Sequence, residues 1–166
     1  IKNYILFRLP LLNKMIEANN IHYSYGSLKV LKGIDLAVKK GEFISIVGAS
    51  GAGKTTLLHI LGTLEKAQEG LLKINNKDVE SLSQQDIANF RNQEIGFVFQ
   101  FHNLLNEFTA LENICLPAYL NKESKKNAEK KARELLDLLN ISTRANHKPD
   151  ELSGGEKQRV AVARAL

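Results

Sequence analysis

The sequence predicts a protein of the α/β class, with a parallel β-sheet core and an antiparallel β flank. Short apolar runs at residues 42–47 and 94–100 have the composition of buried strands, and helical patterns follow both of them. A glycine-rich loop joins the first run to its helix. Strands that alternate with helices behind such a loop are typical of parallel sheets. The strands expected over 16–25 and 30–38 have no helix between them, which predicts the antiparallel flank.

Length and composition fit one soluble globular domain. With 166 residues, 43% hydrophobic and 25% charged, the chain is long enough to bury a core of its own. The net charge is +5, yet the basic residues are spread along the chain, and their densest cluster, at 122–133, alternates with glutamates. This pattern indicates a solvated helix face and argues against a nucleic-acid partner.

Cysteine, histidine and apolar patterning exclude several other classes. Cys115 is the single cysteine, so the chain has no internal disulfide and fits a reducing compartment. We expect it to be a small core or surface hydrophobe. His102, His147 and Cys115 lack the spacing of metal ligands. The sequence has no apolar run of about 18 residues, so no membrane-spanning segment is predicted.

Residues 1–14 differ from the rest of the chain. They are apolar and basic, as in an amphipathic surface segment or a signal peptide, but Pro10 and the lack of a small-residue cleavage site argue against both. The first residue is not Met, and Met15 resembles a natural start. We therefore expect residues 1–14 to be an extraneous or disordered leader, and the domain to begin at residue 15.

The loop after residues 42–47 matches the phosphate-binding pattern G-x-x-x-x-G-K-[ST]. It consists of Gly48, Ala49, Ser50, Gly51, Ala52, Gly53, Lys54 and Thr55, with Thr56 immediately behind. Glycines allow successive N–H groups to turn toward an anion, and the next helix adds its unpaired N-terminal amides. Lys54 supplies a full positive charge, and Thr55 offers a hydroxyl to Mg²⁺. The alternative is a plain glycine-rich turn, but the flanking strand and helix favour a P-loop that binds a nucleotide.

The segments on either side of the P-loop predict the other secondary-structure elements of the N-terminal half of the chain. A turn at Gly26 joins the two opening strands, and the loop helix ends near Gly62. A short strand is expected over 70–76. Ser83 is a suitable N-cap for a helix that runs to about Asn92.

Capping and periodicity predict the helices of the second half. Thr109 and Glu112 form a capping box that opens a helix, which Pro117 should limit. The clearest helix covers 124–140, with an apolar face opposite a face of i,i+4 charge pairs, Lys125 with Glu129 and Glu129 with Arg133. A last helix begins at about Glu156 and is still running at Leu166.

A second phosphate-binding pattern precedes that last helix. Ser153, Gly154, Gly155 and Glu156 follow Leu152 at the helix N-terminus, where an anion is favoured. The same residues also make an ordinary N-cap and turn. Alone, therefore, this motif is a weaker indication than the P-loop.

Together, in this order and roughly a hundred residues apart, the P-loop and Leu152–Arg159 resemble the ATP-binding subunits of ABC transporters. The resemblance covers about 15–166. It implies a P-loop NTPase fold with a RecA-like parallel core and an inserted helical subdomain at about 101–155. It further implies that Gln100 is the Q-loop glutamine, a ligand of Mg²⁺ or of water, and that Tyr25 stacks on adenine. The alternatives are a strand surface role for Tyr25 or Tyr23, and a loop role for Gln100.

The amino-acid sequences of the segments 99–105, 108–113 and 144–149 most resemble those of the ATPases of lipoprotein-releasing complexes, with macrolide exporters as near relatives. This implies a subunit on the cytoplasmic face of the bacterial inner membrane that hydrolyses MgATP to release lipoproteins. Its implied partners are a second copy, whose signature motif would complete each ATP site, and transmembrane permease subunits. Open alternatives are a macrolide- or peptide-type exporter, a soluble kinase or GTPase, and a non-catalytic binding fragment. The apolar anchors for a permease would be Phe101, Leu104, Leu105 and Phe108, each of which could equally be subdomain core.

The family pattern continues, after the signature helix, with a strand ending in Asp-Glu and then a switch histidine. Neither follows Leu166 here. By this resemblance we expect an N-terminal fragment that lacks the C-terminal part of the core. We also expect it to hold no catalytic base and to be inactive alone.

Overall fold

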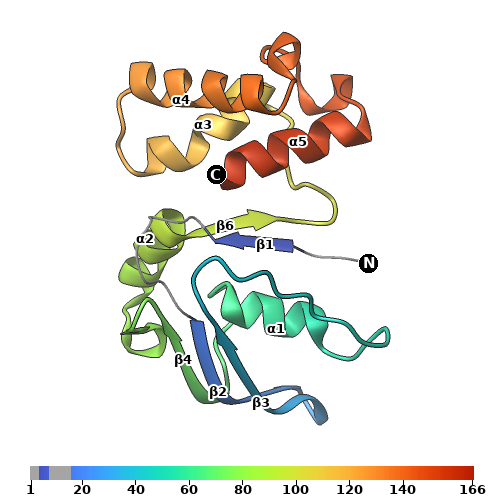
Figure 1. Ribbon diagram of the computed structural model, residues 1–166, viewed down its shortest axis with the longest axis vertical. Coiled ribbons are helices and arrows are strands. Elements are labelled where there is room, and N and C mark those ends of the chain that lie inside the picture. Colours follow the sequence, from blue (N-terminus) through green and yellow to red (C-terminus); the bar gives the residue numbers. More distant parts are fainter. Residues whose placement is uncertain (1–3, 8–15) are drawn as a thin grey trace. The chain divides into compact units, whose positions relative to one another are not determined.

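The computed structural model describes residues 4–7 and 16–166, and they fall into two compact units (Figure 1). The sheet unit lies within Leu9–Arg91, and the helical unit comprises Ile1–Arg8 with Asn92–Leu166. Of the predicted leader, the structure describes only Tyr4–Phe7, which form strand β1. The rest of residues 1–14 lies outside the described residues.

The sheet unit is built on an antiparallel sheet in the order β3-β2-β4-β5. Its strands are β2 (Ile16–Tyr25), β3 (Leu28–Val38), β4 (Glu69–Ile74) and β5 (Lys77–Asp78). The β2–β3 hairpin confirms the predicted flank, and its turn falls at Gly26, where φ is 58°. A 3₁₀ turn, Val79–Ser81, and α2 (Gln84–Glu94) follow the sheet, and the Ser83 hydroxyl caps α2 by accepting the Asp86 N–H at 3.2 Å.

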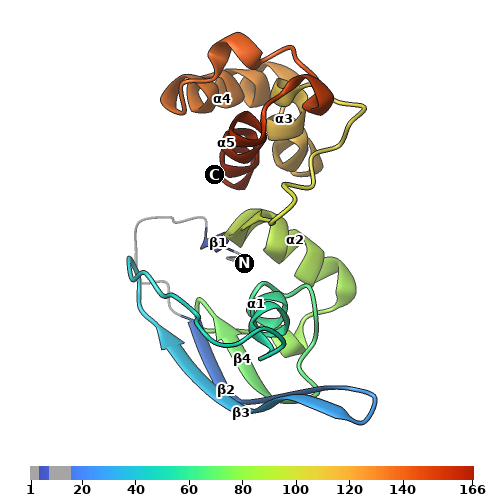
Figure 2. The same ribbon diagram turned by 90° about the vertical axis from the view of Figure 1, so that its right-hand side faces the viewer.

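Helix α1 (Lys54–Leu61) follows the glycine-rich loop and covers one face of this sheet (Figure 2). Its buried residues Leu57, Ile60 and Leu61 belong to the unit's core. The sheet contributes Ile16, Ala18, Ile21, Leu31, Leu72 and Ile74 to that core. The helix ends at Leu61 with Gly62 as its C-cap, as predicted.

The predicted strand over 42–47 is not formed. This segment has irregular backbone, and its side chains Phe43 and Val47 are 99% and 83% exposed. A strand requires a neighbour to satisfy its N–H and C=O groups, and none of the described strands pairs with this run. All pairings among the described strands are antiparallel, so the parallel part of the predicted core is not seen in residues 4–7 and 16–166.

The helical unit packs three α-helices around a core of small and branched side chains. The helices are α3 (Ala110–Leu120), α4 (Lys125–Leu138) and α5 (Gly154–Ala165), with 3₁₀ turns at Ser142–Arg144 and Pro149–Glu151. Their shared core is formed by Ala110, Leu111, Ile114, Cys115, Ala128, Ala132, Leu136, Ile141, Ala145, Leu152, Val160 and Ala163. Strand β6 (Ile95–Val98) contacts α5 and pairs antiparallel with β1.

Two helix predictions in this unit are confirmed, and one boundary was wrong. Thr109 and Glu112 form the expected capping box of α3, and Lys125 pairs with Glu129 at 3.7 Å on α4. However, α3 continues through Pro117 to Leu120. Proline removes a single helical N–H bond, and the final turn is kept by the Asn121 N–H, which donates to the Pro117 carbonyl at 3.2 Å.

None of the described helices is long and apolar enough to cross a membrane. Within the same residues, no cluster of three or more His, Cys, Asp or Glu side chains could hold a metal ion.

Candidate nucleotide-binding site

The end of the P-loop is pressed against the sheet. Gly53 is the N-cap of α1 and has a left-handed backbone, with φ at 85°. A Cβ at this position would lie 2.8 Å from Val30 Cγ1 and 2.9 Å from Leu31 Cδ2, closer than packed carbons approach. Gly51, also left-handed at φ 78°, has open space around its Cα. Glycine at 53 is therefore required twice, by the backbone angle and by the contact with β3.

The N-terminus of α1 is open to an anion. Its cap, Gly53, supplies no side-chain hydrogen bond, and its first turn contains no acidic residue. By contrast, α3 and α5 both begin with a capping box, in which a glutamate lies over the first amides. The partial positive charge of a helix N-terminus is thus left uncompensated at α1.

Lys54 brings a full charge to the same loop. Its ammonium donates to the Gly48 carbonyl at 3.0 Å and to the Ala49 carbonyl at 2.6 Å, so the side chain folds back along the loop that precedes it. Thr55 is exposed at the first turn of α1, whereas Thr56 is buried. The glycine-rich loop, the uncapped amides of α1 and this cation together suit the binding of a phosphate group.

Tyr25 lies on the hairpin that contacts the P-loop. Leu31, which touches Gly53, is the register partner of Tyr23, and Tyr25 follows two residues later on β2. The Tyr25 ring is 52% exposed and lies edge-on to Tyr23, with centroids 5.0 Å apart. Tyr23 donates its hydroxyl to Glu65 Oε2 at 3.1 Å, and burial together with this carboxylate raises the pKa of Tyr23. Tyr23 is therefore fixed, and Tyr25 is the ring available for stacking.

The signature motif starts α5 and belongs to the helical unit. The Ser153 hydroxyl accepts the Glu156 N–H at 3.3 Å, and Glu156 Oε2 accepts the Ser153 N–H at 2.8 Å. Arg144 Nε donates to Glu156 Oε1 at 2.7 Å. The Arg144 hydrogen bond, followed by those from Ser153, lowers the pKa of Glu156 to about 2. Gly154 and Gly155 are exposed, so the approach to the remaining amides of the first turn is open.

Gln100 also belongs to the helical unit, in the turn that follows β6, and it is exposed. The structure thus brings Tyr25 together with the P-loop in one unit, and Gln100 with the signature motif in the other.

The apolar anchors predicted for a permease divide into two groups. Phe101, Leu105 and Phe108 are 80%, 45% and 37% exposed, whereas Leu104 packs against the core of the helical unit. Leu104 is therefore partly buried against the core, and the three exposed side chains are here together called the apolar patch.

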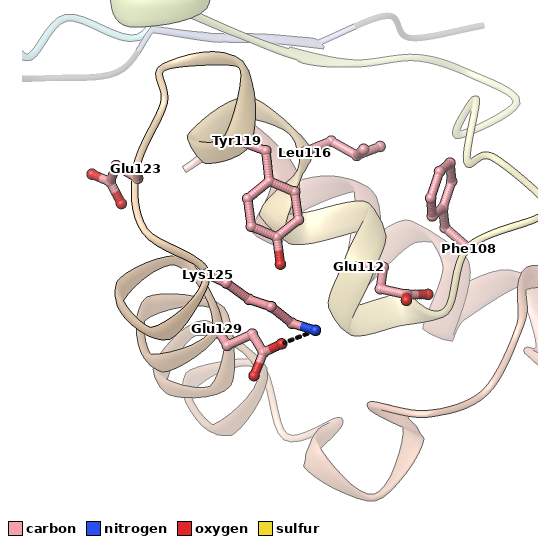
Figure 3. Close-up of a pocket in the computed structure, with 7 residues that line it drawn as sticks. All are labelled: Phe108, Glu112, Leu116, Tyr119, Glu123, Lys125 and Glu129. Atoms are coloured by element: carbon pink, nitrogen blue, oxygen red, sulfur yellow. Dashed lines mark ion pairs between the residues drawn. The ribbon is translucent and has the colours of Figure 1, made fainter.

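A pocket of about 340 Å³ lies next to the apolar patch, between α3 and α4 (Figure 3). Tyr119 and Lys125 point into it, and Phe108 borders it. Burial and a hydrogen bond with Cys115 raise the pKa of Tyr119 to about 12, so this phenol stays neutral at physiological pH.

The comparisons with known proteins identify the family. The family model described as ABC transporter matches residues 31–166. The chain belongs to the ABC transporter family. This confirms the resemblance drawn from the two motifs, and with it the P-loop NTPase fold class.

Relatives in this family cover nearly all of the chain. The lipoprotein-releasing system ATP-binding proteins LolD of Porphyromonas gingivalis and Bacteroides fragilis are 59% and 56% identical to it. The alignments cover 92% of this chain and 69% and 70% of those proteins. A dimeric structure of the bacterial ABC transporter cassette MJ0796 superposes with a TM-score of 0.85 at 42% identity, covering 91% of this chain and 68% of that one. A dimeric post-hydrolysis structure of MJ0796, bound to ADP and Pi, gives a TM-score of 0.83 at 42% identity, with the same coverage.

Two arginines that hold these ABC motifs in place were missed by sequence reasoning. Arg144 fixes Glu156 from twelve residues upstream, across two 3₁₀ turns that no periodicity reveals. Arg164, in the last turn of α5, donates to the carbonyls of His102 and Asn103 in the loop after Gln100. A basic residue in a last helical turn usually indicates only a helix C-terminus, so the sequence carried no pointer to this contact.

Proposed function

We propose that this chain is the ATP-binding part of an ABC transporter that releases lipoproteins from the bacterial inner membrane. The observation that carries the nucleotide assignment is the P-loop, with its open α1 amides and the Lys54 ammonium folded onto it. The lipoprotein assignment is supported by relatives named for lipoprotein release at 59% and 56% identity. Both parts can be tested separately.

In this proposal ATP binds with its phosphates on Gly48–Thr56 and its adenine on the exposed Tyr25 ring. The α1 amides and Lys54 hold the negative charge, because the helix start has no acidic residue to compete with it. Thr55 and, by the family pattern, Gln100 would hold Mg²⁺, which would neutralise charge on the phosphates. The residues of this chain therefore bind and orient the nucleotide, and positioning of this kind is the main contribution of a protein to phosphoryl transfer.

Each site is completed by a second copy of the protein. Ser153, Gly154 and Gly155 form an exposed helix start in the helical unit, and Glu156 is held there by Arg144. In a two-fold dimer the signature motif of one copy faces the P-loop of the other, so two nucleotides are enclosed together. The dimeric cassette structures at 42% identity support this arrangement.

The permease subunits bind the apolar patch on the cytoplasmic face of the membrane. Phe101 at 80% exposure is the most accessible large apolar side chain of the patch, and it follows Gln100 directly. An apolar segment of a permease would bury such side chains, and aromatic anchors of this kind commonly dominate interface energies. A permease bound here therefore lies next to the loop that carries Gln100.

The nucleotide site is tested by Lys54→Ala in the full-length protein, with Lys40→Ala, a change in the exposed turn after β3, as the matched control. Losing a charge that pairs with phosphate costs about 2–5 kcal/mol, so MgATP affinity should fall at least about thirtyfold. Fluorescence titration with a nucleotide analogue measures this change. Unchanged affinity in Lys54→Ala would remove the P-loop assignment.

The transport assignment is tested with the full-length protein and its permease subunits in proteoliposomes that contain a lipoprotein. ATP should drive release of the lipoprotein to an acceptor, and Lys54→Ala should abolish release. ATP hydrolysis that another cargo stimulates, with no lipoprotein released, would replace this assignment by a different exporter class.

A further inference from the structure

The loop that carries Gln100 is shaped by two unusual backbone angles. His102 and Asn103 both have positive φ, at 63° and 47°, and neither is glycine. The turn is closed by the His102 N–H, which donates to the Phe99 carbonyl at 3.0 Å, and by the Asn103 N–H, which donates to the Phe101 carbonyl at 2.7 Å. Such consecutive left-handed residues persist only where the surroundings hold them.

Arg164 of α5 is the group that holds this loop. Its two terminal nitrogens donate to the Asn103 carbonyl at 2.6 Å and to the His102 carbonyl at 2.8 Å. Burial lowers the pKa of Arg164, and in the part of the chain that the structure describes no ion pair includes it. A half-buried guanidinium is thus satisfied by backbone carbonyls, and its planar fork suits the two oxygens at once.

The same helix begins with the signature motif. Helix α5 has 12 residues and is about 18 Å long. Its first turn is fixed by Arg144 through Glu156, and its last turn is fixed to the Gln100 loop through Arg164. Since β6 and α3 also pack on α5, the helix links the two motifs as one stiff element.

We propose that Arg164 is a positioning residue that couples the Gln100 loop to the signature motif. A partner that binds Phe101 displaces the loop, the fork of Arg164 transmits this displacement to α5, and Ser153–Gly155 move with the helix. The inference rests on the proposed function, in which a permease binds the apolar patch. It adds a connection inside the helical unit that is independent of the P-loop.

The test uses the full-length protein with its permease subunits and compares ATPase activity with and without the permease. Arg164→Gln removes the charge and the fork, Arg164→Lys keeps the charge alone, and Arg133→Gln removes a matched charge from the exposed face of α4. We expect the stimulation ratio to fall about 5- to 150-fold in Arg164→Gln, the range of ordinary coupling between sites. Arg164→Lys should lie between Arg164→Gln and the wild type, and Arg133→Gln should equal the wild type. MgATP affinity of the free subunit should change by less than about twofold in Arg133→Gln, which touches neither the P-loop nor the Gln100 loop.

One result would overturn the inference, namely a stimulation ratio of Arg164→Gln equal to that of the wild type. This ratio would be found if both activities stayed unchanged, and also if both fell in the same proportion, as expected of a purely structural residue. If Arg164→Gln does not fold, as judged by its thermal unfolding, the same ratio measured in Arg164→Lys decides: a lower ratio than wild type supports the coupling, and an equal ratio refutes it. A wild type without permease stimulation would instead refute the proposed function itself, before any variant is compared.

Discussion

Replacing Gly53 by alanine tests whether the P-loop is held in shape by its contact with the sheet. At φ 85°, a Cβ costs about 1–2 kcal/mol in backbone strain. The new atom would also lie 2.8 Å from Val30 Cγ1, 2.9 Å from Leu31 Cδ2 and 3.2 Å from the Val30 carbonyl oxygen. Overpacking of this kind costs about 1–3 kcal/mol. We therefore expect Gly53→Ala to lower the free energy of unfolding by about 2–5 kcal/mol, a large part of the total for a domain of this size.

Gly51→Ala is the matched control. Its φ of 78° imposes the same kind of strain, but no atom lies within 4 Å of the added Cβ. Gly51→Ala should therefore lower the free energy of unfolding by only about 1–2 kcal/mol, the cost of the backbone strain without overpacking. Urea unfolding of both full-length variants measures the difference, and nucleotide titration shows whether the displaced loop also loses affinity. If Gly53→Ala were as stable as Gly51→Ala to within about 0.5 kcal/mol, the contact with β3 would not constrain the loop.

The remaining predictions concern the helical unit. The pKa of Glu156 is about 2, below the ordinary value of 4.5, so the carboxylate stabilises the fold above about pH 4.5, and this stabilisation is lost as the pH falls toward about 2. Glu156→Gln should thus have a lower free energy of unfolding than the wild type at neutral pH, and this difference should shrink as the pH falls below about 4.5. Urea unfolding at neutral and at acidic pH measures the difference, and a difference that is the same at both would contradict this. Asn113 is fully buried, accepts the Leu105 N–H at 2.8 Å and donates to the carbonyls of Leu105, Phe108 and Thr109. Asn113→Leu leaves these groups without their partner and should lower the free energy of unfolding by about 3 kcal/mol, whereas Asn127→Leu, on the exposed face of α4, should change it by less than about 0.5 kcal/mol.

Local patterns predicted most of the secondary structure, because the relevant physics acts within a few residues. The capping box at Thr109 and the hairpin turn at Gly26 depend on neighbours in the sequence, and both formed as expected. The run at 42–47 shows the limit of this reasoning. Its apolar, β-branched composition suits a buried strand, but a strand also depends on a partner that local sequence does not specify. With no described strand beside it, Phe43 and Val47 are exposed.

The residues of the candidate site could likewise be predicted where they are local in sequence, and not where they depend on tertiary contacts. The P-loop and the signature motif are contiguous in sequence, so their residues could be named from spacing alone. Arg144 and Arg164 act on these motifs through tertiary contacts at sequence separations of 12 and about 60 residues, and no local pattern encodes such contacts. Leu104 and Phe101 were equivalent as sequence, and only packing separates the partly buried residue from the exposed one.

The N-termini of α1 and α5 differ in what they offer an anion. Helix α1 leaves its amides without a cap, so phosphate meets only positive charge there. At α5, the Ser153–Glu156 box already satisfies two amides and places a carboxylate beside the remaining ones. Such a start would repel phosphate if Glu156 were not paired with Arg144. In the proposed function, the α1 site therefore binds a nucleotide within one subunit, and the α5 start contacts a nucleotide already bound to another copy. That difference favours ATP binding first and dimer closure second.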